Sequence, residues 1–477
     1  MLTFIIGFCL LLIGGWFYSA RVERIFGPDD RKTPAYALEN GVDFIPMGKW
    51  QNALIQLLNI AGTGPILGPI MGILFGPVAF ILIPIGNIFA GSVHDYFCGM
   101  MSMRHDGEQM PQMVKRYMGN KVFGVYNLFL CLTLFLVAAV FLYLPGDLFV
   151  NQIMGREAVL SEPMLWAVYG VIFAYYLVAT LFPIDKIIGR VYPVFGLILL
   201  LSSIGIGIGL FAKGYPLDEL SFANWKGLYP KGQALIPMFF VTVACGIVSG
   251  FHASQTTLIS RTLKSEREGR LVFYGMMVAE GVIAMIWAAA AMGLYNKGIE
   301  QKLVGTPAVV GLVAKDMLGY IGGMIAIVGV IVLPITSGDT ALRAMRLIIG
   351  ENLKMDQSLK RNRLLISTVI LAGVAGLLVF AKTSGDDFGK LWRYFAWSNQ
   401  TLAVFTFTLA ALYLLKQKKG ILLVLIPGAF YLFVIASYIF NQEIGFGLSD
   451  TLSYTLAAGL TGAYAGWFLR LKRKSGV

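Results

Sequence analysis

The sequence predicts an all-α membrane protein with about thirteen transmembrane helices, two of them discontinuous, built as an inverted repeat of five plus five spans. Three observations support this fold class. Of the 477 residues, 57% are hydrophobic and 13% are charged, whereas soluble proteins carry roughly 25% charged residues. Many apolar runs are long enough to cross a bilayer, and the number of basic residues between them alternates. Glycine and proline interrupt two of these runs, one in each half of the chain.

The predicted spans are runs of about 20 mostly apolar residues, the length that a bilayer requires. In chain order they cover 2–20, 51–73, 76–99, 121–144, 163–182, 191–212, 234–258, 271–295, 319–341, 364–381, 394–415, 420–440 and 451–469. The first span lacks a preceding basic residue, and Arg21 and Arg24 follow it, so we expect it to be retained rather than cleaved as a signal peptide. The mixed segments 104–118 and 299–317 follow the second span of each repeat and predict short interfacial helices.

The basic residues predict the orientation of the chain. If the loops alternate between the two sides, 28 Lys and Arg lie on one side and 10 on the other. The positive-inside rule then places the N-terminus outside and the tail Arg470–Lys474 in the cytoplasm. The formal net charge of +12 therefore suits the anionic lipids of the cytoplasmic leaflet and does not indicate nucleic acid as a partner.

The two interrupted spans, 2 and 7, lie five spans apart and therefore cross the membrane in opposite directions. This relation is typical of the inverted repeats of secondary transporters. We expect four segments: an extra N-terminal span with a cytoplasmic loop (1–50), repeat 1 with spans 2–6 (51–213), repeat 2 with spans 7–11 (234–415), and two C-terminal spans with a basic tail (416–477).

The interruptions predict a substrate site. The first lies at 59–69 and contains two Gly-Pro-Ile units, and the second lies at 245–256. In lipid a broken helix survives only inside protein or beside a watery cavity, and the ends of half-helices attract cations and carboxylates. The alternative is that the glycines simply permit close helix packing. The predicted substrate-binding residues are Gly62, Thr63, Gly64, Ser249, Gly250, His252 and Gln255.

Two of the three histidines lie in or at the end of predicted spans, where an ionisable side chain is costly and therefore a functional candidate. His252 lies in the second break and could bind an anionic substrate, relay a proton, or donate as a neutral imidazole to a freed carbonyl. His94 and Asp95 lie toward the cytoplasmic end of span 3, where a gate ion pair competes with simple interfacial solvation. These three residues could in principle ligate zinc, but such scattered ligands are weak evidence. We predict no metal site and no cofactor.

Candidate ion-coupling residues lie in spans 8 and 9. Glu280 has no other charged residue within nine positions on either side, so it should be protonated, paired or exposed to a cavity. Proton coupling and a structural hydrogen bond to span 7 are both open for it. Thr336, Ser337 and Asp339 close span 9 with oxygens that suit a hard cation such as sodium or that cap the helix.

Span 11 opens with an aromatic run, typical of an interfacial belt, followed by Asn399 and Gln400. Amides at this depth need partners inside the bundle, and we predict a gate or structural role for them. The four cysteines show no CxxC spacing, which argues against a disulfide framework. No nucleotide-binding loop, HExxH motif or nucleophile elbow is present, so we do not expect an enzyme.

Several motifs resemble those of the carbon starvation protein A (CstA) family. They are Gly64-Pro-Ile-Leu-Gly-Pro-Ile70, Gly91-Ser-Val-His-Asp95, Ser249-Gly-Phe-His-Ala-Ser-Gln255, Phe273-Tyr-Gly, Leu333-Pro-Ile-Thr-Ser-Gly-Asp-Thr340 and Trp392-Arg-Tyr-Phe-Ala-Trp-Ser-Asn-Gln400. They run in family order over essentially the whole chain, which looks like a shorter member without the long additional C-terminal region. The resemblance implies uptake of peptides or pyruvate through the inner (plasma) membrane under nutrient limitation. It also implies membership of the amino acid–polyamine–organocation superfamily, with a fold similar to the leucine transporter.

The leading hypothesis is a secondary active symporter that imports peptides, pyruvate or both by alternating access. Its partners would be a small-molecule substrate, a coupling ion and the lipid bilayer. The resemblance implies proton coupling, for which Glu280 and Asp339 are the candidate carriers. A sodium site would use Thr336, Ser337 and Asp339 with carbonyls of span 2. The alternatives are a sodium-coupled symporter of small carboxylates or amino acids, a passive channel, and a nutrient sensor that does not transport.

Overall fold

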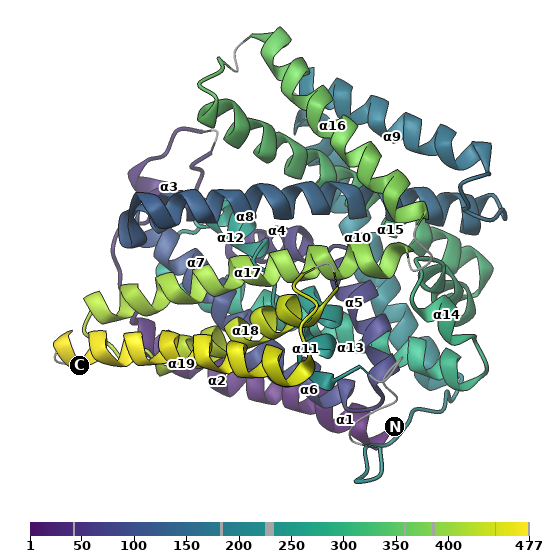
Figure 1. Ribbon diagram of the computed structural model, residues 1–477, viewed down its shortest axis with the longest axis horizontal. Coiled ribbons are helices and arrows are strands. Elements are labelled where there is room, and N and C mark those ends of the chain that lie inside the picture. The colour runs from purple at the N-terminus through teal and green to yellow at the C-terminus, as the bar shows by residue number, and fades with distance from the viewer. Residues whose placement is uncertain are drawn as a thin grey trace. The chain divides into compact units, whose positions relative to one another are not determined.

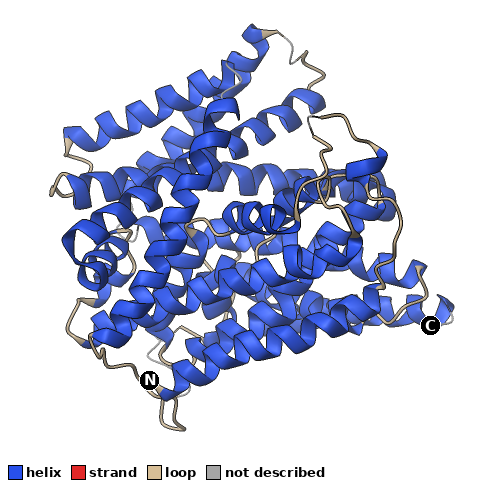
Figure 2. Cartoon of the chain, turned by 180° about the vertical axis from the view of Figure 1, so that it is seen from behind, coloured by secondary structure: helices blue, strands red, loops and turns tan. Residues whose placement is uncertain are grey.

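The chain is helical throughout the part that the structure describes. The computed structural model describes residues 1–41, 43–181, 185–224, 233–356, 359–383, 387–443 and 445–475. These residues form helices joined by loops, with no strand among them (Figures 1 and 2). Eight of the described helices are long and apolar enough to cross a membrane, and counting one bent pair as a single span gives nine. The chain is thus a multi-pass membrane protein, and the number of thirteen spans stays a prediction.

Two compact units make up the chain. Unit 1 consists of Met1–Phe129, Asp218–Met285 and Ala396–Val477, and unit 2 consists of Leu130–Leu217 and Ile286–Phe395. Both units draw helices from both predicted repeats. Three long helices pass from one unit to the other along the chain: α8 (Met110–Leu148), α13 (Met276–Asn296) and α17 (Asp387–Lys416).

Unit 1 contains both predicted breaks. Its other helices are α1 (Leu2–Cys9), α2 (Gly15–Phe26), α3 (Pro34–Ala37), α4 (Lys49–Ile60), α5 (Gly64–Gly72), α6 (Ala79–Gly86), α7 (Ser92–Arg104), α11 (Leu235–Val243), α12 (His252–Ile259), α18 (Leu422–Asn441) and α19 (Asp450–Ser475). Every residue of α5 is buried, as expected for a helix that is apolar all round and lies at the centre of a bundle.

Unit 2 contains α9 (Pro163–Leu181), α10 (Asp185–Ala212), α14 (Gln301–Val304), α15 (Ala308–Asn352) and α16 (Lys360–Thr383). Small residues let α10 and α15 approach closely. A Cβ added to Gly209 of α10 would lie 2.6 Å from the carbonyl oxygen of Met317 in α15. Such contacts are typical of helix pairs in membranes, where small side chains bring backbones together.

The first break is narrower than the sequence predicted. The helix ends at Ile60 and resumes at Gly64, and the two halves are bent by 54°. The prediction of an interruption over 59–69 is wrong for its second half, because Pro65 and Pro69 lie inside α5. Pro65 falls at the start of the helix, where the missing N–H has no intrahelical acceptor in any case, so proline fits there without breaking the helix.

The second break is shifted toward the N-terminus relative to the prediction of 245–256. Helix α11 ends at Val243, a short 3-10 turn covers Ala244–Gly246, and α12 begins at His252. Ala244 has a φ of +42°, which an L-residue adopts only at a cost. His252 and Gln255, which we expected in the break itself, lie in the first turn of α12.

The two breaks pack against each other inside unit 1. A Cβ on Gly68 of α5 would lie 2.2 Å from the carbonyl oxygen of Val243, and a Cβ on Gly64 would lie 2.5 Å from Cβ of Cys245. Neither position has room for a side chain. Close packing, which the sequence offered as the alternative explanation of these glycines, therefore accounts for Gly64 and Gly68, although the helix that carries them is also broken.

Two glycines divide long helices at matching places. Gly119 in α8 has φ 83° and ψ 174°, and Gly319 in α15 has φ 72° and ψ 178°. Each separates a short leading helix (Met110–Met118 and Ala308–Leu318) from the long helix that follows. A positive φ is cheap only for glycine. The first leading helix lies within the segment 104–118 that we predicted to be interfacial, and the second ends one residue beyond the predicted segment 299–317.

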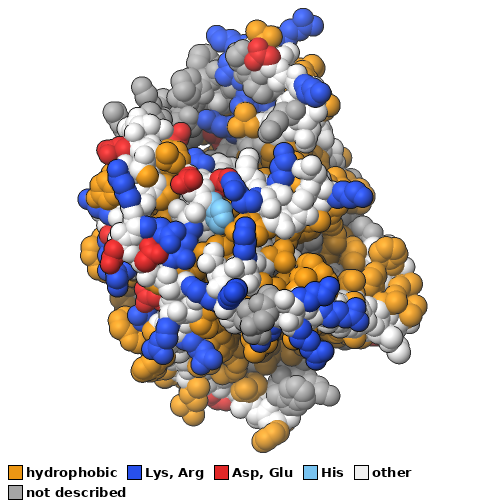
Figure 3. Space-filling view, turned by 90° about the vertical axis from the view of Figure 1, so that its left-hand side faces the viewer, with side chains coloured by type: hydrophobic (Ala, Val, Ile, Leu, Met, Phe, Trp, Pro, Cys, Tyr) orange, Lys and Arg blue, Asp and Glu red, His pale blue; other side chains and the backbone are white. Residues whose placement is uncertain are grey.

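Basic residues gather at the ends of the C-terminal helices of unit 1. The last turn of α17 carries Lys416, and the last turn of α19 carries Lys472, Arg473 and Lys474. Both helix ends lie on the same side in Figure 1, and the face viewed in Figure 3 is rich in Lys and Arg. The predicted orientation assigns this side to the cytoplasm.

Candidate functional site

Most of the predicted site residues come together in the interior of unit 1. They derive from the first break, α7, the second break, α12, α13 and α17. The buried polar side chains among them are Thr63, His94, Asp95, Ser249, His252, Gln255, Glu280, Asn399 and Gln400. Burying so many polar groups is costly unless they are paired, so their partners decide what the site can do.

Four of these residues form a buried chain of alternating imidazoles and carboxyls, which we call the His94–Glu280 chain. His94 Nδ1 lies 2.8 Å from Asp95 Oδ1, and His252 Nδ1 lies 3.1 Å from Asp95 Oδ2. On its other side, His252 Nε2 lies 3.8 Å from Glu280 Oε2. None of the four side chains is more than 2% exposed. His252 thus stands between two carboxyl groups.

The geometry limits where protons can sit in this chain. An ionised Asp95 can only accept hydrogen bonds, so both imidazole Nδ1 atoms that face it carry a proton. A neutral His252 then presents a bare Nε2 toward Glu280, which suits a protonated Glu280. A cationic His252 presents an N–H, which suits an ionised Glu280. A single proton can therefore occupy either residue, and a shift of under 1 Å would bring the 3.8 Å separation into hydrogen-bond range.

Both ends of the chain have unused hydrogen-bonding capacity. Both carboxyl oxygens of Glu280 and Nε2 of His94 are buried and have no hydrogen-bond partner among the described residues. The structural hydrogen bond from Glu280 to span 7 that we considered is therefore missing from the described part of the chain. Interfacial solvation is the wrong interpretation of His94 and Asp95, because both are 0% exposed. His252 bonds to a carboxylate rather than to a freed carbonyl.

The amides of span 11 hold the second break in place. Asn399 Oδ1 accepts a 2.7 Å hydrogen bond from the backbone N–H of Phe251, and its Nδ2 donates to Ser249 Oγ at 2.9 Å. Gln400 Nε2 donates to the carbonyl oxygen of Phe240 at 2.7 Å. A broken helix leaves backbone groups without intrahelical partners. Asn399 supplies such a partner to Phe251, and Gln400 adds a second hydrogen bond to the carbonyl of Phe240, which also accepts from the N–H of Ala244. Both contacts support the structural role that the sequence allowed for these amides.

The predicted substrate-binding residues divide into packing positions and open positions. Gly64 and Gly250 are packing positions: a Cβ on Gly250 would lie 2.3 Å from the carbonyl oxygen of Asn399. Gly62, by contrast, has no atom within 4 Å of the place where a Cβ would sit. The neighbouring Thr63 Oγ1 is buried and has no hydrogen-bond partner among the described residues. Gly62 and Thr63 are therefore the positions in the first break that a ligand could contact.

The predicted residues of span 9 belong to unit 2, whereas Glu280 belongs to unit 1. Capping of a helix end is the wrong interpretation of Thr336, Ser337 and Asp339, because α15 continues to Asn352. Thr336 Oγ1 donates to the carbonyl oxygen of Leu333 at 2.8 Å, and Asp339 Oδ2 lies 3.5 Å from Arg343 Nη2. Ion coupling by these residues stays a prediction.

A cavity of about 530 Å³ lies elsewhere in unit 1. It is bounded by α8, α17, α18 and α19 and is lined almost entirely by apolar groups. Its lining residues are Tyr117, Met118, Val122, Phe129, Thr401, Val404, Phe405, Thr408, Leu412, Leu432, Ile435, Tyr464 and Trp467. None of these is a predicted site residue. In the described part of the chain, no group of three or more His, Cys, Asp and Glu is arranged to hold a metal ion.

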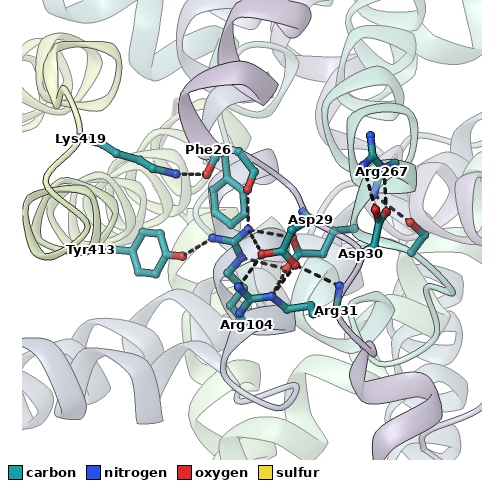
Figure 4. Close-up of polar contacts among 11 residues, drawn as sticks. Phe26, Asp29, Asp30, Arg31, Arg104, Arg267, Tyr413 and Lys419 are labelled. Atoms are coloured by element: carbon teal, nitrogen blue, oxygen red, sulfur yellow. Dashed lines mark hydrogen bonds and ion pairs between the residues drawn. The ribbon is translucent and has the colours of Figure 1, made fainter.

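An ion cluster that we did not anticipate from the sequence lies at the end of α7 (Figure 4). Arg104 binds both carboxylate oxygens of Glu266, each at 2.8 Å. The same guanidinium donates to the carbonyl oxygen of Gly27 at 2.7 Å and to the hydroxyl of Tyr413 at 3.2 Å. This Arg104–Glu266 cluster ties the loop after α2, the end of α7, the turn before α13 and the end of α17 together within unit 1.

The loop that joins this cluster carries its own ion pair. Asp29 donates its backbone N–H to Glu266 Oε2 at 2.9 Å, and its carboxylate accepts from Arg31 Nη2 at 2.7 Å. The hydrogen bond from Arg31 is the main reason why the pKa of Asp29 lies well below its ordinary value. The two aspartates and one arginine at 29–31 are the only sequence signal for this cluster, because Glu266 is more than 200 positions away.

Comparisons with known proteins agree with this architecture. Residues 1–207, 144–321 and 304–437 match the family model described as carbon starvation protein CstA. An uncharacterized membrane protein of Haemophilus influenzae is 42% identical over 340 residues, which cover 62% of this chain and 92% of that protein. The peptide transporter CstA of Bacillus subtilis is 25% identical over 531 residues, which cover 90% of this chain and 88% of that protein. The pyruvate/proton symporter BtsT of Escherichia coli is 27% identical over 346 residues, which cover 60% of this chain and 48% of that protein.

The chain therefore matches about half the length of some relatives, including BtsT and the Helicobacter pylori peptide transporter CstA, of which it covers 50%. Among solved structures, the manganese transporter of Eremococcus coleocola has a similar fold. The TM-score is 0.58 at 14% sequence identity, with 90% of this chain and 97% of that chain covered. At this identity the likeness concerns the fold alone.

Proposed function

Because the chain belongs to the carbon starvation protein CstA family, we propose that it is a secondary active transporter that imports peptides or pyruvate in symport with protons. Relatives in this family are named as peptide transporters and as a pyruvate/proton symporter, and the fold resembles that of a transporter. Transport takes place across the cell membrane, with the N-terminus outside and the basic C-terminal tail in the cytoplasm.

Paired structural features support an inverted five-plus-five repeat as the basis of alternating access. Each proposed repeat opens with a broken helix, α4–α5 in the first and α11–α12 in the second. In each, a glycine of nearly identical backbone dihedrals, Gly119 or Gly319, separates a short helix from the long third helix. The broken first helices of both repeats and the second span of repeat 1 fall in unit 1, α13 is divided between the units, and spans 5, 6, 9 and 10 fall in unit 2. A division of each repeat between two bodies suits a rocking mechanism.

The His94–Glu280 chain is the observation that carries the proposal of proton coupling. Its four titratable side chains are buried beside the second break, where His252 begins α12, and a proton can reside on His252 or on Glu280. Buried ionisable groups inside a membrane bundle mark proton pathways in transporters. The substrate carboxylate would contact the first break at Gly62 and Thr63, beside the start of α5, with His252 and Gln255 nearby.

Uptake into proteoliposomes tests the proposal. Labelled pyruvate and a labelled dipeptide are offered under an inward pH gradient in sodium-free buffer, and separately under a sodium gradient. We expect the pH gradient alone to drive accumulation. Glu280→Gln should keep substrate exchange in the absence of a gradient but lose the dependence on the pH gradient, because a neutral amide cannot release a proton.

Asp339→Asn is the matched variant at the other candidate carrier, and it tells whether the proton passes through unit 1 alone or also through unit 2. A requirement for sodium, with unchanged pH dependence in both variants, would refute proton coupling. Exchange of internal for external substrate distinguishes a carrier from a channel or a sensor, since only a carrier accelerates uptake when unlabelled substrate is present inside.

A further inference from the structure

A buried arginine in unit 2 lacks hydrogen-bond partners among the described residues. Arg346, near the end of α15, is 6% exposed, and its Nε and Nη1 are buried without a hydrogen-bond partner among the described residues. A guanidinium is always charged and carries five N–H donors. Leaving such a group desolvated and unpaired is unfavourable. An anion at this place would remove that cost.

Two further arginines surround Arg346. Arg343 lies one turn before it on α15, where residues three apart share a face. Arg363 belongs to the first turn of α16, and its Nε is also buried without a hydrogen-bond partner among the described residues. The positive charges of Arg343 and Arg363 both act on Arg346. Three like charges that converge in this way repel each other.

Asp339 does not satisfy Arg346. It lies 3.5 Å from Arg343 and also acts on Arg346, yet Nε and Nη1 of Arg346 make no hydrogen bond to the described residues. Arg363 lies in the first turn of α16, where the helix dipole adds further positive potential. The described geometry thus presents unused N–H donors and positive charge from two helices that pack against each other.

We propose that Arg346 and Arg363 bind a phosphate group, either the headgroup of an anionic phospholipid or a soluble phosphate compound. A phosphate group matches the charge, and the planar guanidinium pairs with its oxygens through two parallel hydrogen bonds. Exposed leucines next to the cluster, Leu347 on α15 and Leu364 on α16, offer apolar surface for acyl chains. The positive-inside count assigns this loop to the cytoplasmic side, where anionic lipids attract basic segments.

The test compares binding of two probes by the full-length protein in nanodiscs of phosphatidylcholine. In one arm phosphatidylglycerol is added, and its retention is followed by native mass spectrometry and thermal unfolding. In the other arm inorganic phosphate is titrated by calorimetry. We expect Arg346→Gln and Arg363→Gln each to weaken binding about tenfold or more, since each removes a charge-assisted pair.

Arg361→Gln serves as the matched control, because Arg361 lies in the same turn of α16 but is exposed; we expect a change of about twofold or less. Binding of phosphatidylglycerol without inorganic phosphate would assign the site to lipid, and the reverse would assign it to a soluble phosphate compound. In pure phosphatidylcholine, Arg346→Gln should not lower the melting temperature, because it removes an unpaired buried charge.

Three results would overturn the proposal. The first is that the wild-type protein binds neither probe. The second is that both glutamine variants bind as tightly as the wild type. The third is that Arg346→Gln is strongly destabilised in phosphatidylcholine, which would mean that the arginine already has a structural partner. None of these readouts depends on transport, so their outcome is independent of whether the proposed symport is correct.

Discussion

At the residue scale, Asp95 is the centre of the His94–Glu280 chain, because both of its oxygens accept hydrogen bonds from imidazoles. We expect Asp95→Asn to reduce uptake strongly and to destabilise the fold by about 3 kcal/mol or more. An asparagine keeps one acceptor but points its NH₂ group at an imidazole that also donates, so one buried donor is left unpaired. Uptake in proteoliposomes and thermal unfolding measure the two effects.

The third histidine provides the matched control for this prediction. His105 bonds to the carbonyl oxygen of Met101 at 2.7 Å and to the hydroxyl of Tyr117 at 2.9 Å, outside the His94–Glu280 chain. His105→Gln should leave the dependence of uptake on the pH gradient unchanged. If Asp95→Asn transports like His105→Gln, the buried chain has no part in coupling.

At the scale of elements, two glycines at the first break allow a packing role to be distinguished from contact with the substrate. Gly68 lies in α5 and Gly62 lies in the break itself. Gly68→Ala would place a Cβ 2.2 Å from the carbonyl oxygen of Val243, which is backbone and cannot move aside cheaply. We expect a loss of stability of about 1–3 kcal/mol, as for other overpacked sites, together with loss of uptake. Thermal unfolding of the purified variant measures the first effect.

Gly62→Ala is the informative comparison, because nothing lies within 4 Å of its added Cβ. We expect this variant to fold as well as the wild type, or slightly better because alanine restricts the unfolded chain. A raised KM for uptake with unchanged stability would place Gly62 in the substrate site. Unchanged kinetics would remove it from the site, and a loss of stability would contradict the structure at this break.

The Arg104–Glu266 cluster makes a prediction about how neighbouring elements are held together. The pair is 9% and 0% exposed, so removal of either partner leaves a buried charge with only a longer ion pair, 3.5 Å from Arg31 to Glu266 or 3.7 Å from Arg104 to Asp29. We expect Arg104→Gln and Glu266→Gln each to cost about 3 kcal/mol or more, and the double variant to cost clearly less than the sum. Strict additivity in this double-mutant cycle would show that the two residues do not act as a pair.

The dependence of this cluster on pH follows from Asp29. Because hydrogen bonding to Arg31 lowers the pKa of Asp29 in the folded protein, its contribution to stability is present above its ordinary value of 3.8 and is lost as pH falls further toward the folded value. The cluster should therefore be insensitive to pH in the neutral range. Weakening near neutral pH would instead point to a group other than Asp29.

At the scale of the whole molecule, the charge distribution predicts which loops face the cytoplasm. In a background in which Cys9, Cys98, Cys131 and Cys245 are replaced by serine, a cysteine is introduced either at Ser161 or at Gln417, both exposed. A maleimide that cannot cross membranes should label Ser161→Cys on intact cells and Gln417→Cys only after permeabilisation. The reverse pattern would invert the predicted topology.

Much of the helical organisation could be predicted from the sequence. The interruptions of spans 2 and 7, the short helices before Gly119 and Gly319, and the need of Asn399 and Gln400 for internal partners all follow from local composition. The limits of the breaks could not be predicted well. Proline within a stretch suggests interruption over its whole length, yet a proline in the first turn of α5 loses no hydrogen bond. The limits of the second break were equally hard to predict from its glycines, and the sequence therefore placed His252 in the break rather than in α12.

The sequence by itself determined that this chain is a helical membrane protein with two broken spans. In lipid every backbone polar group needs a hydrogen-bond partner, which a helix supplies within its own segment, and about 20 apolar residues are needed to cross the bilayer. Only the tertiary structure decided that Asp95 meets His252, 157 positions away, and that Arg343, Arg346 and Arg363 converge in unit 2. Such pairings depend on which helix faces are packed together. Charges that are isolated along the chain become neighbours only through that packing, because the contacts that bring helices together are made by the apolar residues around them.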